Sequence, residues 1–354
     1  MQIFNKVHLS SPVIAAILAA ILFGASTPFA KALIGDYSPI LIAGLLYLGS
    51  GIGLMLIRVI RDRGWSNPKL RSNEWPWLFG AISFGGVLGP ILLMYGLTQI
   101  SSATASLLLN LEAVLTSVIA WLVFKENADK RIVLGMILII LGGVLLSWTH
   151  NTTHSGELLG ALAIAGACLC WAIDNNLTRK VSALDSFFIA GSKGLIAGTV
   201  NVYLAYKLGS KLPELPMIIT VLICGFFGYG LSLLLFIFAL RGLGTSRTGA
   251  YFSVAPFIGA GIAILFFRDS STLNFWFALA FMGAGVWLHL TEKHEHEHIH
   301  VADCHEHSHR HDEHHQHSHD FAYDGNSEHR HQHEHKELQH VHHHYPDVEH
   351  LHTH

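Results

Sequence analysis

Long apolar stretches alternate with short polar loops up to about residue 292, and a polar segment, 293–354, follows. Each apolar stretch is about as long as the roughly 20 residues that a helix needs to cross a hydrocarbon core of about 30 Å. The predicted spans are 12–34, 38–60, 75–97, 102–124, 131–149, 157–178, 187–207, 216–239, 246–267 and 272–291. None shows the alternation of a membrane β-barrel. The pattern predicts an all-α integral membrane protein with ten transmembrane helices.

The positive charges in the connecting loops predict the orientation of these helices. Cytoplasmic loops are enriched in Lys and Arg. If the N-terminus is cytoplasmic, fourteen Lys and Arg residues fall on the cytoplasmic side and four on the other. We therefore expect a multi-pass protein of the inner or plasma membrane with both termini in the cytoplasm.

The two halves of the apolar region resemble each other. Residues 23–31 match 171–179, and residues 101–126 match 244–269 without a gap. Each half contains five predicted spans, so the second half enters the membrane inverted relative to the first. Inverted repeats of this kind form many secondary transporters, with the substrate site near the midplane between the halves. The predicted domains are residues 10–149, residues 156–292 and the tail, 293–354.

The repeated segments also carry a resemblance to a known family. Residues 100–116, closed by the sequence Ala-Trp-Leu-Val-Phe-Lys-Glu, and their partner, which begins at Gly244, resemble EamA-type members of the drug/metabolite transporter superfamily. This resemblance implies ten helices and a cavity lined mainly by helices 1, 3, 4, 6, 8 and 9. It also implies export of small metabolites or amino acids, driven by exchange or by an ion gradient.

Two positions depart from the family pattern and weaken any substrate inference from it. Ala113 stands where the family has a proline, which Pro256 keeps in the second half. Leu46 stands where the family often has an arginine in helix 2, and Lys193 occupies the matching place in helix 7.

Three ionisable residues inside the predicted spans are candidates for transport or coupling, because charges at membrane depth are costly and usually functional. Glu112 lies near the middle of its span, about 15 Å from either surface at 1.5 Å per residue. Asp174 and Lys193 lie at similar depth on consecutive spans, so an ion pair between them is expected. Glu112 has the chemistry of a proton- or cation-coupling carboxylate. The alternative is that these charges only fasten the helices together.

Four neighbours are candidates for the substrate cavity. Trp171 and Asn175 share a helical face with Asp174. Tyr95 and Tyr251 lie on the third and ninth spans. An aromatic residue in a membrane span is also commonly packing or an interfacial anchor.

The tail contains 23 of the 27 histidines of the chain. Neutral imidazole is a good ligand for Zn²⁺, Ni²⁺, Co²⁺ and Cu²⁺. The spacing matches no zinc finger, and the composition predicts a disordered tail with many exchangeable sites. The candidate metal ligands are His294, His296, His298, His300, His305, His307, His309, His311, His314, His315, His317 and His319.

The sequence therefore predicts a secondary transporter that exports a small polar or amphipathic, amino-acid-like metabolite by alternating access. One alternative is a divalent-metal efflux protein, and another is a metal- or pH-responsive regulatory membrane protein. Metal ligands are scarce in the spans, which argues against metal as cargo. No catalytic constellation is evident, so an enzyme is not expected. The expected partners are the lipid bilayer, a small-molecule substrate and transition-metal ions. No required cofactor and no nucleic acid are expected, and a homodimer is left open.

Overall fold

The computed structural model describes residues 11–68, 70–124, 130–147, 155–181 and 184–290 of the apolar region. In the tail it describes 295–300, 303–309, 329–335 and 338–343. The chain divides into two units, Met1–Glu292 and Lys293–His354, each described here by itself.

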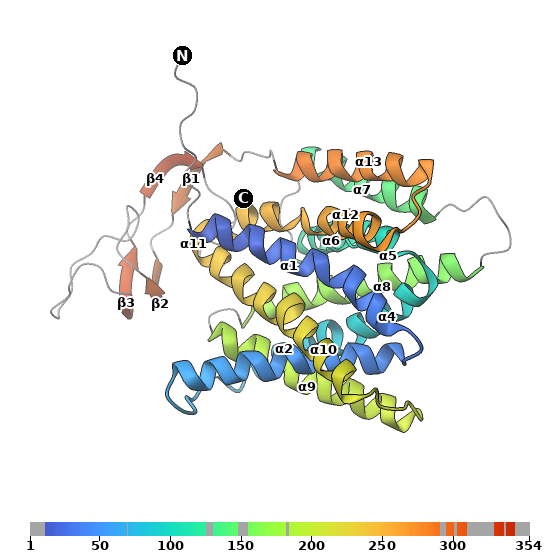
Figure 1. The fold of residues 1–354 in the computed structure, drawn as a ribbon. Helices are drawn as coiled ribbons and strands as arrows, with labels where there is room; N and C mark the ends of the chain where they lie inside the picture. The colour runs from blue at the N-terminus through green and yellow to red at the C-terminus, as the bar shows by residue number, and fades with distance from the viewer. Residues whose placement is uncertain are drawn as a thin grey trace, which may run out of the picture. The chain divides into compact units, whose positions relative to one another are not determined.

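The first unit is a bundle of helices (Figure 1). Its first half contains α1 (Ser11–Ile34), α2 (Pro39–Arg61), α3 (Trp75–Ala81), η1 (Ile82–Leu88), α4 (Gly89–Gln99), α5 (Ser102–Leu108), α6 (Leu111–Phe124) and α7 (Lys130–Ser147). Its second half contains α8 (Ser155–Arg179), α9 (Ser186–Lys207), α10 (Leu215–Gly225), η2 (Phe226–Leu231), α11 (Ser232–Phe252), α12 (Ala255–Phe267) and α13 (Leu273–Leu290). The segments η1 and η2 are π-helices.

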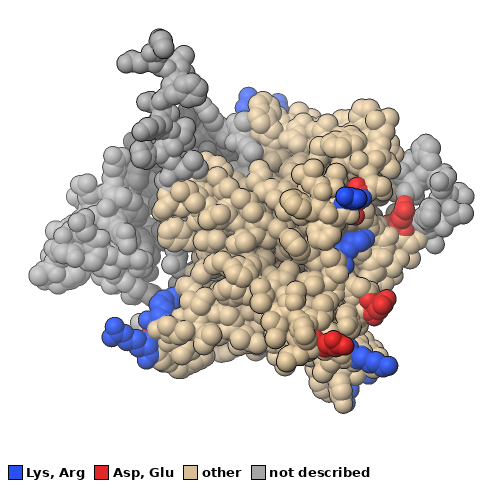
Figure 2. All heavy atoms as spheres, in the orientation of Figure 1, with Lys and Arg blue, Asp and Glu red and all other residues tan. Residues whose placement is uncertain are grey.

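Eight helical segments of the described residues are long and apolar enough to cross a membrane. They correspond to the first eight predicted spans. Two shorter apolar helices, Ala255–Phe267 and Leu273–Leu288, occupy the places of the ninth and tenth. Charged side chains gather at opposite ends of the face in Figure 2, and uncharged residues form a broad belt between them. The chain is a multi-pass membrane protein.

The structure differs from the predicted spans at several boundaries. The predicted helix 102–124 is interrupted between α5 and α6, and the third and eighth spans contain π-helical turns. The predicted loop between residues 239 and 246 is helical and lies within α11, and a second break falls between α11 and α12. The chain nevertheless reverses within α11, because the ring centroids of Phe236 and Phe252 lie 4.8 Å apart, whereas a straight helix would separate these residues by about 24 Å. Apolar content identified the membrane segments but carried no information about these local changes in backbone hydrogen bonding.

Helix α2 lies at the centre of one layer of the bundle, beside α9 (Figure 1). Glycines on both helices face each other: a Cβ atom at Gly194 would lie 2.5 Å from the backbone nitrogen of Gly51. A Cβ at Gly44 would lie 2.7 Å from the nitrogen of Val202. Small residues permit this close backbone approach between membrane helices. The two helices therefore form one tightly packed pair.

Two faces of the bundle are named here after residues near them. The Lys31 face is where α1 ends and α2 begins, and the Arg58 face is where α2 and α8 end. On the Lys31 face, Ser102 Oγ and the Ala103 backbone nitrogen donate to Asp269 Oδ2 at 2.6 and 3.0 Å. Lys31 Nζ donates to the carbonyl of Ile100. The contacts of Asp269 join the two halves, and the bond from Lys31 joins two segments of the first half.

The second unit contains four strands in two antiparallel pairs. Strand β1 (Glu295–His300) pairs with β4 (Leu338–His343), and β2 (Asp303–His309) pairs with β3 (His329–His335). Over these segments the structure differs from the predicted disordered tail. Histidine recurs at nearly every second position, and that spacing is the period of a β-strand.

We expect that Gly194→Ala will lower the free energy of unfolding by about 1–3 kcal/mol, because the added methyl group overpacks the α2–α9 contact. Thermal unfolding of the purified protein measures this change. Gly261→Ala is the matched control, because a Cβ at that helical glycine meets nothing within 4 Å. If both variants unfold like the unmodified protein, α2 and α9 do not approach as closely as described.

Candidate functional site

The candidate site is built around α8, which presents polar side chains to three neighbouring elements. Trp171, Asp174, Asn175 and Thr178 lie at the spacing of one helical face. Trp171 contacts η1, Asp174 contacts α9, and Asn175 contacts α6. Each contact joins α8 to a different helix, so one helical face brings the predicted residues together.

Asp174 and Lys193 form the predicted ion pair. Lys193 Nζ lies 2.7 Å from Asp174 Oδ1 and 2.5 Å from Oδ2, and Thr178 Oγ1 donates to Oδ1 at 2.9 Å. Lys193 is 9% exposed and Asp174 is 5% exposed. Two buried charges are tolerated where they are paired and their remaining polar atoms are satisfied. The pair is electrically neutral.

Glu112 lies beside this pair but is held differently. Its Oε1 accepts a 2.8 Å hydrogen bond from Asn175 Nδ2. Among the described residues, Glu112 forms no ion pair with Lys or Arg. Glu112 is partly exposed and Asn175 is exposed. Polar groups at membrane depth usually line water-filled cavities or the bundle interior rather than face lipid, so the Glu112–Asn175 bond is the candidate contact for a polar solute.

The π-helix η1 supplies a backbone acceptor next to the ion pair. A π-helical turn disrupts the regular i to i−4 bonding, and such turns are frequent at functional sites. The Gly85 carbonyl accepts bonds from Tyr47 Oη at 2.8 Å and Trp171 Nε1 at 3.0 Å. Gly85 also contacts the Asp174 carboxylate so closely that any Cβ there would collide with it. Glycine at this position permits the approach of α8 to η1.

The other predicted cavity residues separate into two groups. Trp171 is 6% exposed and its ring lies among other aromatic rings, whereas Tyr95 and Tyr251 are 43% and 38% exposed. Within the described residues, none of the hydrogen bonds, ion pairs or ring contacts joins Tyr95 to Glu112, Asp174 or Lys193. Tyr251 adjoins Phe252, whose ring lies 5.3 Å from Phe23. Tyr95 and Tyr251 were chosen because they lie on helices predicted to line the cavity, and that choice could not show which way their rings face.

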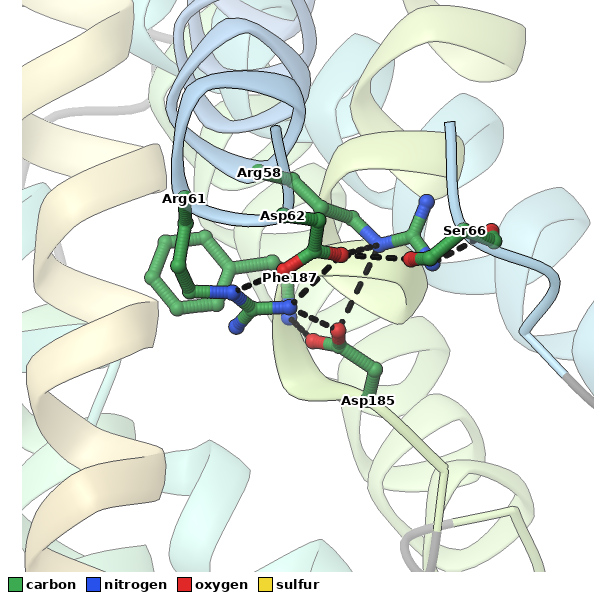
Figure 3. Close-up of polar contacts among 6 residues, drawn as sticks. All are labelled: Arg58, Arg61, Asp62, Ser66, Asp185 and Phe187. Carbon is green, nitrogen blue, oxygen red and sulfur yellow. Dashed lines mark hydrogen bonds and ion pairs between the residues drawn. The ribbon is translucent and has the colours of Figure 1, made fainter. Parts of the chain in front are cut away.

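A second charged cluster, on the Arg58 face, was not predicted as a site (Figure 3). Arg58 is 1% exposed; its Nε lies 3.3 Å from Asp185 Oδ2, and its Nη2 donates to Ser66 Oγ at 2.8 Å. Arg61 pairs with both Asp62 and Asp185. The cluster ties the end of α2 to the first turn of α9, where Asp185 also accepts a bond from the Phe187 nitrogen. Arg58 lies inside a predicted span, so the rule that selected Glu112 could have selected it.

This cluster remains ionised over a wide pH range. Hydrogen bonds from Arg61 and Ser66 lower the pKa of Asp62 to about 2. Burial alone would raise the pKa of Asp185, but bonds from Arg61 and the Phe187 nitrogen hold it below its usual value. Because both carboxylate pKa values are depressed by folding, the stabilisation is present above about pH 4. It is lost as pH falls through the lowered values.

The predicted metal ligands lie in the second unit. Strands β1 and β2 contain His296, His298, His300, His305, His307 and His309. The remaining candidates, His294, His311, His314, His315, His317 and His319, lie outside the described residues. Within the described residues, no group of three or more His, Cys, Asp and Glu side chains that could hold a metal ion is found.

Comparison with known proteins decides the family. The model of the EamA-like transporter family matches residues 10–148 and again residues 158–291. The chain belongs to the EamA-like transporter family. The two matched segments coincide closely with the two halves predicted from the sequence, and together they cover most of the chain.

Several EamA-like relatives are similar over much of their length. The chain is 29% identical over 272 residues to an uncharacterized transporter of Methanothermobacter thermautotrophicus, covering 72% of this chain and 79% of the relative. It is 34% identical over 107 residues to a probable 4-amino-4-deoxy-L-arabinose-phosphoundecaprenol flippase subunit, ArnE, of Pseudomonas paraeruginosa. That match covers 30% of this chain and 89% of the relative.

A solved crystal structure shares the fold, with a TM-score of 0.59 and 18% sequence identity. The match covers 79% of this chain and 95% of the solved chain. EamA-like membership and these relatives establish a membrane transporter. They do not name its cargo, and the family is one of transporters rather than enzymes.

We expect Asp174→Asn and Lys193→Met each to lower the free energy of unfolding by about 3–5 kcal/mol, because each leaves one buried charge without its partner. The double variant should recover much of this loss. A double-mutant cycle of thermal or denaturant unfolding measures the coupling, with Lys211→Met, an exposed lysine, as the control. Simple addition of the two losses would contradict the pairing.

Proposed function

We propose that this protein is a secondary transporter that exports a small polar or amphipathic, amino-acid-like metabolite by alternating access. Glu112 is the coupling residue, Asp174 and Lys193 position α8 against α9, and Trp171, Asn175, Tyr251 and Tyr95 belong to the cavity. The protein lies in the inner or plasma membrane with both termini cytoplasmic, so the Arg58 face is the cytoplasmic face. The observation that carries the proposal is the accessible Glu112–Asn175 bond beside a buried, neutral ion pair.

Matched irregularities support an inverted repeat of two five-helix halves. The breaks between α5 and α6 and between α11 and α12 fall at positions that the ungapped sequence match superimposes. The π-helices η1 and η2 correspond in the same register. Their contacts correspond as well: a Cβ at Gly85 would meet Asp174, and a Cβ at Gly228 would meet Ser26, which matches Asp174 in the other half.

The two halves differ in packing, which supports alternating access. Toward the Lys31 face, a Cβ at Gly259 would lie 2.7 Å from Ser106 Oγ and 2.6 Å from the Gly24 carbonyl. The positions that match Ser106 and Gly259 are Gly249 and Thr116. A Cβ at Gly249 meets nothing within 4 Å. The contact at these matched positions is thus present toward the Lys31 face and missing at Gly249 toward the Arg58 face, although Thr116 Oγ1 is itself buried. Such a difference between the halves is expected for one conformation of a transporter built from inverted halves.

Proton coupling at Glu112 follows from the chemistry of the site. A carboxylate without a cationic partner at membrane depth is stabilised by a proton or by a bound cation. Because Glu112 is partly exposed and Asn175 is exposed, a proton or a cation can reach the carboxylate from that side. Transport then requires that the proton and the substrate use Glu112 in alternation, with the neutral Asp174–Lys193 pair unchanged.

We expect Glu112→Gln to reduce proton-coupled flux at least about tenfold, because the amide side chain does not take up a proton at the pH of the assay. Proteoliposomes containing a pH-sensitive dye, challenged with a mixture of amino acids and amines, measure this flux. Glu214→Gln, which changes an exposed carboxylate at the start of α10, should behave like the unmodified protein. Full proton-driven flux in Glu112→Gln would remove Glu112 from the coupling step.

The tail supports a second proposal, that it binds Zn²⁺, Ni²⁺, Co²⁺ or Cu²⁺. The backbone register sets His305, His307 and His309 opposite His333, His331 and His329. Opposed positions in an antiparallel pair have Cβ atoms about 4.5–5.5 Å apart, a spacing from which two imidazoles can share an ion. Metal efflux, or metal- or pH-responsive regulation, are the functions that this binding would serve.

We expect a chain ending at Glu292 to lose most of its Zn²⁺ or Ni²⁺ binding while keeping proton-coupled flux. Metal binding is measured by titration calorimetry of both chains, and flux by the same vesicle assay. Cells producing each chain are then grown in excess metal. Metal tolerance that depends on the tail would favour metal efflux over metabolite export. Unchanged metal binding after truncation would contradict the role of the tail.

A further inference from the structure

The charge of the Glu112 cluster restricts what can bind there. The charges of Asp174 and Lys193 cancel each other, and Lys193 Nζ donates to both oxygens of the Asp174 carboxylate. With Glu112 ionised, the cluster of three residues therefore carries one net negative charge. A negative charge in a medium of low dielectric constant strongly favours a cation nearby. An anionic ligand would find no unpaired Lys or Arg in this cluster.

Aromatic rings from both halves of the bundle gather around Phe23, and one of them is Trp171 of α8. Phe23 is central to this group: its centroid lies 6.3 Å from that of Trp171, 6.0 Å from Tyr229 and 5.3 Å from Phe252. These four residues are the ring group. Trp171 lies one helical turn before Asn175, the residue that binds Glu112, so the ring group and the carboxylate are neighbours along α8.

The ring group is not sealed on all sides. Phe23 and Phe252 are partly exposed; Tyr251, next to Phe252 in the chain, and Asn175, one turn after Trp171, are exposed. Gly249, one turn before Phe252, has open space around it. Ring faces carry partial negative charge and attract cations. Ring faces beside a carboxylate that has no cationic partner form an arrangement that can recognise an organic ammonium ion.

We propose that Glu112 and the ring group bind a monovalent organic cation, an ammonium group attached to an apolar body, in competition with a proton. The ammonium group lies at the Glu112 carboxylate, and the apolar body lies against Phe23 and Phe252. This assignment rests on the proposed transport function and narrows its substrate class from amino-acid-like metabolites to amines. A zwitterion is disfavoured because its carboxylate would face the ionised Glu112.

Three probes of similar size and different charge test this assignment: phenethylamine (cation), phenylalanine (zwitterion) and 3-phenylpropionate (anion). Titration calorimetry on the purified full-length protein measures binding without any need for transport. We expect phenethylamine to bind at least about tenfold more tightly than the other two, with release of a proton into the buffer. Its affinity should fall as pH is lowered, because protons then compete for Glu112. Tighter binding of the zwitterion or the anion would overturn the proposal.

Variants locate the site. Glu112→Gln should weaken phenethylamine binding at least about tenfold and abolish proton release, and Phe23→Leu should weaken binding while keeping proton release. Glu112→Asp should restore proton release, and Glu214→Gln should change nothing. Unaltered binding in Glu112→Gln would overturn the assignment. If Glu112→Gln does not fold, the pH dependence and proton release of the unmodified protein decide.

The binding and flux measurements separate this proposal from the transport function. Phenethylamine binding with proton release, but no proton-coupled flux in vesicles, would leave the cation site standing and contradict the transport proposal. Proton-coupled flux of amino acids, without phenethylamine binding, would contradict the cation site and leave transport standing.

Discussion

The cost of placing charge inside a membrane governs the arrangement of this protein. Asp174 and Lys193 offset this cost by forming an ion pair between α8 and α9, and Thr178 donates a hydrogen bond to the Asp174 carboxylate. On the Arg58 face, the charge of Arg58 is stabilised by its ion pair with Asp185 and its hydrogen bond to Ser66. Of these three groupings, the partly exposed Glu112 is the one held by a neutral amide rather than by an opposite charge. The uncompensated charge is therefore confined to one position, and that position adjoins the exposed Asn175.

Close backbone packing makes this distribution of charge possible. Glycines bring α2 against α9 and η1 against α8, so Lys193 and Asp174 lie within direct bonding distance. The π-helical turn of η1 turns the Gly85 carbonyl toward Tyr47 and Trp171. These contacts fix α8 on two sides. Its third polar contact, to α6 through Asn175 and Glu112, is the one that a proton or a substrate would change.

Much of the fold follows from the sequence because apolar length is a strong signal. The spans, the two halves and the residues Glu112, Asp174 and Lys193 were predicted from hydropathy, internal similarity and the cost of buried charge. The Asp174–Lys193 pair was predicted from depth alone, and the structure contains it.

Other features could not be predicted from these signals. Tyr95 was selected only by its helix, and its place in the cavity stays a prediction, because a helix assignment does not fix which way a side chain faces. The partners of Arg58 lie on a loop and on α9, and no local pattern links them. Asn110 lies at the break between α5 and α6, where its Nδ2 contacts Met282 Sδ of α13 at 3.9 Å and donates to the Leu107 carbonyl at 2.9 Å. The break between α5 and α6 produces that bond, and hydropathy carries no sign of it.

The central claim is that the bundle is closed toward the Lys31 face, open toward the Arg58 face, and able to exchange these states through matched contacts. The most direct measurement follows the reactivity of a cysteine at Asn175, in a protein without its native cysteines, toward a thiol reagent that cannot cross the membrane. With Thr116→Cys and Gly249→Cys also present, we predict that the Asn175 cysteine reacts readily while this pair is reduced. Once the cysteines at positions 116 and 249 are oxidised to a disulfide, the cysteine at position 175 should be protected from the thiol reagent. Equal reactivity in both states would contradict the account.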